Sequence, residues 1–171
     1  MSFYHRIYAF CSLNLTHIHP VVKWIHPTVV SCYFAIFSRA YAMLSNQNQF
    51  QSEFEKAEIS IKEKIITNPE DPRYHSALGR VLALLGKKDE ALNEGRLAIT
   101  LLPIDQDAFN GPRYLNQLAE IYVIAGADDL AIEALKKLSN IPGGLRVGYL
   151  QVNPIYNSLR GNPEFEALLT K

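Results

Sequence analysis

The amino-acid sequence predicts an all-α fold, a right-handed superhelical solenoid of about three helix-turn-helix repeats followed by a C-terminal cap. Between residues 72 and 103, apolar residues recur at three- and four-residue steps in two runs separated by Gly86, as in two antiparallel amphipathic helices. The register recurs 34 residues earlier, at Leu44, and 40 residues later, at Leu118, when both are compared with Leu78. Because each helix pair has two apolar faces, neighbouring pairs must stack on one another.

Residues 72–103 form the clearest of these repeats. The apolar positions are Tyr74, Ala77, Leu78, Val81, Leu82 and Leu85 in the first predicted helix, and Ala91, Leu92, Gly95, Ala98, Ile99 and Leu102 in the second. We expect the small residues Gly79, Ala91 and Ala98 to lie where the helices approach closely.

The first repeat, residues 35–71, is more degenerate. The sequence predicts an inner helix over 36–45, a turn over 46–49, and an outer helix over 51–67 with an apolar stripe at Phe54, Ala57, Ile61 and Ile65. The run Asn-Pro-Glu-Asp-Pro at 68–72 ends this helix, because proline is not tolerated in a helix interior. Pro72 suits the first turn of the next helix.

The third repeat is predicted over residues 112–142, after six extra residues within 104–111. Residues 143–171 follow as a capping tail, with Phe165 as its expected anchor. Asn162, Pro163 and Glu164 together predict a helix start, with a side-chain cap, a fixed φ and an acid in the first turn.

Residues 1–34 have no helical period and are interrupted by Pro20 and Pro27. The longest apolar run, 29–37, is far shorter than the ~20 residues of a membrane span, so no transmembrane helix is predicted. Three interpretations stay open: an apolar N-terminal cap, a targeting segment, or a start codon assigned too far upstream. The cytoplasm is the expected compartment if the segment does not direct export, and we expect the fold not to depend on the segment.

The repeats resemble the tetratricopeptide repeat (TPR), a 34-residue motif with large and small residues at fixed positions. The matching residues are His75, Leu78, Gly79, Leu82, Ala91, Gly95, Ala98 and Pro103. His75 stands where the motif has Trp, and Gly95 where it has an aromatic residue. The tail is similar to the end of a bacterial group of TPR proteins that close with two proline turns and a Phe-x-x-Leu-Leu helix, and this resemblance covers about residues 36–171.

No catalytic arrangement emerges from the sequence, so we predict neither an enzyme nor a cofactor. His17, His19 and His26 lack an acid or cysteine at metal-ligand spacing, and Cys11 and Cys32 have no zinc or redox spacing. The sequence therefore predicts no metal site, and His75 is expected to pack in its repeat.

The charge is distributed unevenly along the chain. Residues 1–50 hold 3 of the 17 bases and no acid, so their net charge is +3. Residues 51–171 hold 14 bases and 17 acids, so their net charge is −3. This balance disfavours nucleic-acid binding.

The inner helices of a solenoid line its concave face, where partners bind. Arg39, Arg73 and Arg113 each precede the signature leucine by five residues. Cations are disfavoured at helix N-termini, so the recurrence of arginine at this position suggests that these residues have a function. The complete predicted peptide-binding groove consists of Arg39, Arg73, Ser76, Arg80, Arg113, Asn116 and Gln117, with Glu120 interrupting its basic character. The alternative is that these residues form ordinary solvated helix faces.

The first functional hypothesis is a non-catalytic scaffold that holds a protein or peptide segment in the groove. The arginines predict an acidic segment, or one ending in a free carboxylate. The TPR resemblance implies the same, because TPR domains often hold peptides and some clamp a terminal carboxylate. In the bacterial group, repeats often follow a kinase, cyclase or DNA-binding domain, so the alternative is a regulatory module acting on a separately encoded signalling protein. The sequence does not predict the oligomeric state.

Overall fold

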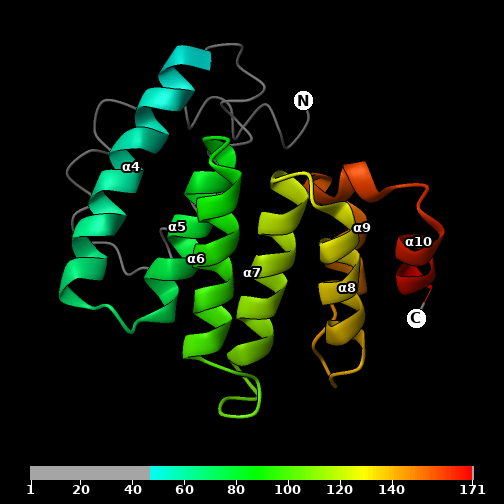
Figure 1. Cartoon of the computed structure of the whole chain (residues 1–171). Coiled ribbons are helices and arrows are strands. Elements are labelled where there is room, and N and C mark those ends of the chain that lie inside the picture. The colour runs from blue at the N-terminus through cyan, green and yellow to red at the C-terminus, as the bar shows by residue number, and fades with distance from the viewer. Residues whose placement is uncertain (1–46, 171) are drawn as a thin grey trace, which may run out of the picture. The chain divides into compact units, whose positions relative to one another are not determined.

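The computed structural model describes residues 47–170, with side chains from residue 51 onward. Its elements are α4 (Gln47–Thr67), α5 (Pro72–Leu84), α6 (Lys88–Leu101), α7 (Gly111–Ile124), α8 (Asp128–Ser139), α9 (Val147–Val152), the 3₁₀ helix η2 (Pro154–Leu159) and α10 (Pro163–Leu169) (Figure 1). This part of the chain contains helices and no β-strand, which confirms the predicted all-α class. The packing divides the chain after residue 52 into two units, and residues 53–170 belong to the second. The predicted segment 1–34, the predicted helix 36–45 and Arg39 lie outside the described residues.

Helix α4 starts earlier than expected. Residues 47–49 are helical, so the turn predicted over 46–49 is wrong at these positions. Glutamine has a good helix propensity, and this stretch contains neither Gly nor Pro to stop a helix. The predicted apolar stripe is present, with Phe54, Ala57 and Ile61 buried and Ile65 half-buried.

The two complete hairpins, α5–α6 and α7–α8, have matching turns. At the end of α5, Gly86 has a φ of 76°, and the amide of Lys87 donates to the carbonyl of Leu82 over 2.9 Å. At the end of α7, Gly126 has a φ of 70°, and the amide of Ala127 donates to the carbonyl of Tyr122 over 2.8 Å. Both turns satisfy the last helical carbonyls through a left-handed glycine. The helix periods therefore predicted both the hairpins and their connections.

Helix α7 packs against both helices of the preceding hairpin. A Cβ atom built on Gly79 would lie 2.9 Å from Cδ1 of Ile121 and 3.0 Å from the carbonyl oxygen of Ala91. A Cβ on Gly95 would lie 2.8 Å from Cδ1 of Leu118 and 2.9 Å from the same Ile121 atom. Ile121 therefore fills the space in front of both glycines, and close approach at Gly79 and Ala91 is confirmed.

The tail packs on the second hairpin. Its buried residues Leu150, Tyr156, Leu159, Phe165 and Leu168 belong to the same apolar core as buried residues of α7 and α8. The rings of Tyr156 and Phe165 are stacked with centroids 6.0 Å apart, and Phe165 has no exposed surface. The side chain of Asn162 accepts a hydrogen bond from the amide of Glu164 over 2.9 Å, which confirms the helix start predicted there.

Candidate functional site

The predicted groove residues within the described part lie on two adjacent helices. Arg73, Ser76 and Arg80 belong to α5, whereas Arg113, Asn116 and Gln117 belong to α7. Helices α5 and α7 pack directly against each other, so the structure brings these two sets together. Their individual surroundings differ, and these differences decide what each residue can offer a partner.

Ser76 and Gln117 join the two helices. The hydroxyl of Ser76 donates to Oε1 of Gln117 over 2.5 Å, and both residues are buried. Such a buried pair satisfies polar groups that would be costly to leave without a partner. The hydrogen bond therefore holds α5 and α7 in register, and it already uses one polar group of each residue.

Arg80 belongs to a polar network centred on Glu120, which is only 2% exposed. Nη2 of Arg80 lies 3.2 Å from Oε2 of Glu120. The hydroxyl of Tyr149 in α9 donates to Oε1 of Glu120 over 2.6 Å, and the amide of Asn116 reaches the same oxygen at 3.4 Å. Burial, followed by the nearby negative charge of Glu120, raises the pKa of Tyr149, so this tyrosine stays a neutral donor. The network compensates the charge of Arg80 within the protein.

The central role of Glu120 and the contribution of Tyr149 were not predicted. One signal was available: Arg80 and Glu120 are 40 residues apart, the same offset as Leu78 and Leu118, so they occupy equivalent positions in the two hairpins. Opposite charges at equivalent positions of stacked helices indicate a pair. Tyr149 lies in the tail, outside the repeated register, and its sequence context carries no such signal.

Arg73 and Arg113 also occupy equivalent positions, but they differ in exposure and in partners. Nε of Arg73 lies 2.9 Å and 3.0 Å from the two carboxylate oxygens of Asp71. These hydrogen bonds hold the pKa of Asp71 below its usual value of 3.8, against the opposing effect of burial. Gly111 stands where the second hairpin would have the equivalent of Asp71, and Arg113 is exposed with no ion-pair partner in the described part of the chain. The guanidinium of Arg113 is therefore the more available of the two.

His75 packs inside the first hairpin. Its Nε2 donates to the carbonyl oxygen of Pro69 over 2.8 Å, and its Nδ1 lies 2.7 Å from Oε2 of Glu94. The residue is 4% exposed, in agreement with the expected packing role. Both ring nitrogens have partners, so the histidine connects the turn before α5 to helix α6.

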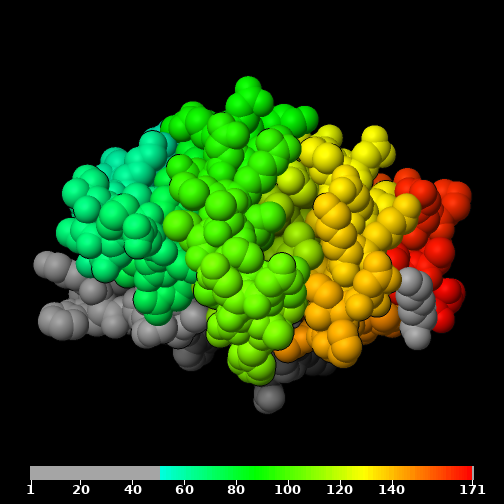
Figure 2. Space-filling view, turned by 60° about the horizontal axis from the view of Figure 1, so that its bottom comes forward, coloured from blue at the N-terminus to red at the C-terminus, as the bar shows by residue number. Residues whose placement is uncertain are grey.

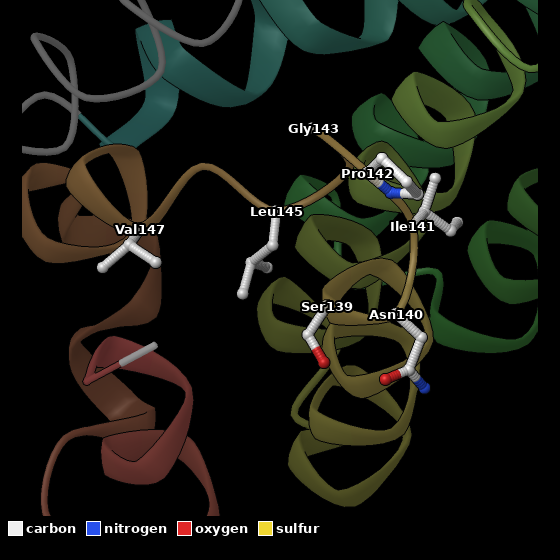
Figure 3. Close-up of a pocket in the computed structure, with 7 residues that line it drawn as sticks. All are labelled: Ser139, Asn140, Ile141, Pro142, Gly143, Leu145 and Val147. Carbon is white, nitrogen blue, oxygen red and sulfur yellow. The ribbon is translucent and has the colours of Figure 1, made fainter.

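A hollow of about 420 Å³ lies away from this groove, where the chain leaves α8 (Figure 3). The lining residues are Ser139, Asn140, Ile141, Pro142, Gly143, Leu145 and Val147. The side chain of Leu145 lies between Val147 and the Ile141–Pro142 pair. The lining combines apolar side chains with the polar groups of Ser139 and Asn140, and it contains no titratable side chain.

Residues 47–170 contain no group of three or more His, Cys, Asp or Glu side chains arranged to hold a metal ion. The histidines considered above as metal ligands, His17, His19 and His26, lie outside this range. None of the helices described is both long enough and apolar enough to cross a membrane. In comparisons with known proteins, no family model, no curated protein and no solved structure matches the chain.

Proposed function

We propose that the chain is a TPR-like solenoid that acts without chemistry, as a scaffold holding a partner segment along α5 and α7. The observation that carries this proposal is the packing of α7 against both helices of the preceding hairpin. Stacking of this kind aligns successive first helices and creates an extended surface from equivalent positions. The matching turns at Gly86 and Gly126 support the same repeated geometry.

The charges along these helices refine the kind of partner segment we propose. Asp71 and Glu120 compensate two of the arginines, so the groove attracts acidic segments less strongly than the predicted row of arginines alone. Arg113 is exposed and Asn116 is half-buried, so these residues offer a guanidinium and an amide to a ligand. An extended segment with one carboxylate, including a free C-terminus, fits this pair through charge-assisted and amide hydrogen bonds.

A selection from random peptides tests this function directly. The full chain would be used to select peptides from two libraries, one displaying free C-termini and one with internal sequences. We expect peptides with a carboxylate to be enriched by the wild-type chain and to lose at least about tenfold in affinity on Arg113→Ala with Asn116→Ala, since both hydrogen-bonding groups are removed.

Lys56→Ala provides the matched control, because Lys56 is an exposed cation on α4 with an ion pair to Glu53. Peptides that bind the double variant and the wild type equally well would place binding elsewhere and contradict the proposed groove. Circular dichroism melting of each variant would separate lost binding from lost folding.

A further inference from the structure

We propose that the chain forms a closed dimer in which Phe109 of each copy inserts into the hollow after α8 of the other copy. This inference concerns the opposite end of the hairpins from their glycine turns, and it does not depend on the proposed groove. It rests on an exposed aromatic side chain, a hollow that can accept it, and complementary charges beside both.

Phe109 is the most exposed large apolar side chain among residues 51–170, at 89%. It lies in the loop between α6 and α7, which contains the extra residues that interrupt the repeat register. A fully solvated phenylalanine is unfavourable in isolation, and aromatic side chains contribute large apolar areas when buried at interfaces. The loop therefore presents an apolar anchor for a partner.

The Phe109 loop is held in one conformation by its own hydrogen bonds. Oδ1 of Asp107 accepts from the amides of Phe109 over 2.9 Å and of Asn110 over 2.8 Å, and the backbone carbonyl of Asp107 accepts from Gly111 over 2.8 Å. The two ends of the loop meet at Gly111, where a Cβ atom would lie 2.7 Å from Cα of Ile104. A preorganised loop loses little conformational entropy when its tip is buried, which favours its use in binding.

The hollow has the volume to receive the Phe109 ring, and four of its seven lining residues have apolar side chains. Its volume of about 420 Å³ exceeds that of a phenyl ring, and Ile141, Pro142, Leu145 and Val147 supply apolar contacts. Figure 3 shows Leu145 at its centre, with its side chain directed into the space below the linker. Burial of the ring there would remove apolar surface of both copies from water.

The Phe109 loop and the hollow lie at the same end of the molecule. Helix α7 starts from this loop, and α8 returns antiparallel to it, so the end of α8 comes back to the level where α7 starts. Figure 2 views this end, with the yellow-green loop near the orange residues that follow α8. A two-fold axis through this end allows each Phe109 to reach the other copy's hollow, and a self-complementary surface of this kind closes at two copies.

The charges beside the two features agree with this pairing. Asp105 is exposed in the Phe109 loop, and Arg146 is exposed between the lining residues Leu145 and Val147. Neither has an ion-pair partner among residues 51–170. In the dimer, Asp105 of one copy would face Arg146 of the other, which favours a second copy of this chain over an unrelated apolar partner.

Sedimentation velocity of the full chain over a wide concentration range tests the dimer. We expect a reversible approach to twice the monomer mass and no larger species, with weak affinity because two aromatic contacts bury a small area. Phe109→Ser should weaken association at least about tenfold. The control Val152→Ser removes a side chain that is 76% exposed on α9 and should leave association unchanged.

Charge exchange provides the second measurement. Asp105→Arg and Arg146→Asp should each weaken association, and the double variant should restore it, because the pair is re-formed with reversed signs. A chain that stays monomeric at all concentrations, forms open-ended oligomers, or associates equally well with Phe109→Ser would overturn the proposal. If the chain is a monomer, the exposed Phe109 loop remains a binding surface for a different protein.

Discussion

The two hairpins have the same turns but are held together differently. In the first hairpin, the buried residues of α6 are all small: Ala91, Gly95 and Ala98. In the second, α8 buries the large side chains of Ile132, Leu135 and Leu138 together with two alanines. The difference follows from what covers each second helix. Small residues let α6 approach α5 and α7 closely, whereas α8 needs large side chains to fill the space under the tail.

The greatest loss of stability is expected in the second hairpin, at its contact with the tail. Phe165→Ala would leave a cavity beside the stacked ring of Tyr156, and it should lower the free energy of unfolding by about 3–5 kcal/mol. Chemical denaturation would measure this change. Val152→Ala, at an exposed apolar position, serves as the control and should change stability by less than about 0.5 kcal/mol. A small effect at Phe165 would mean that the tail does not stabilise α8.

An added methyl group should destabilise the first hairpin where α5 and α6 approach each other. Gly79→Ala would bring a Cβ against the backbone of α6 as well as Ile121, and we expect a loss of about 1–3 kcal/mol. Gly95→Ala meets only the flexible ends of Leu118 and Ile121, so the higher helix propensity of alanine, worth about 1 kcal/mol, should offset most of its cost. Thermal melts of both variants would test this order. Equal losses would show that the backbone contact at Gly79 is not decisive.

A smaller loss of stability is expected from a change at the N-terminus of α5. Asp71 caps the helix by accepting from the amide of Arg73 over 3.0 Å, so Asp71→Ala should cost about 1 kcal/mol at neutral pH. Because the folded-state pKa of Asp71 is lowered below 3.8, its ionic contribution is present above that pH and disappears as the pH falls through the lowered value. Asp71→Asn keeps an acceptor for the cap and separates the two effects. Its stability should approach that of the wild type in acid, and a constant difference from pH 7 to pH 2 would contradict this account.

The smallest loss of stability is expected at an ion pair that joins the first hairpin to α4 and has no equivalent in the second hairpin. Nζ of Lys87 lies 2.8 Å from a carboxylate oxygen of Glu58 in α4, whereas the equivalent position of the second hairpin is Ala127. Lys87 is exposed, so Lys87→Ala should lower the free energy of unfolding by no more than about 1 kcal/mol, and by less at high salt. Denaturation at two salt concentrations would measure both quantities. A loss that does not change with salt would indicate a packing role for Lys87.

The helix periods and turn glycines were sufficient to predict α5 to α8, since these signals are local and repeat along the chain. The side-chain cap at Asn162 could be predicted for the same reason. The groove was less predictable, because its chemistry depends on pairings between helices. The acids at 71 and 120 were visible in the sequence, and the 40-residue offset of Arg80 and Glu120 was a usable signal for one pair. The distances to Arg73 and Arg80 come from the fold. The hydrogen bond from Tyr149 spans 29 residues and leaves no periodic signal.

The separation of α8 and Phe165 along the chain has a consequence for synthesis. A ribosome completes α8 well before it completes α10, so Leu135 and Leu138 emerge without the side chains that later pack in their core. Exposed apolar surface on a nascent chain is a target for chaperones and a cause of aggregation. A chain interrupted between residues 140 and 163 would keep this surface uncovered. We therefore expect the addition of α10 to make the newly made chain less prone to aggregation.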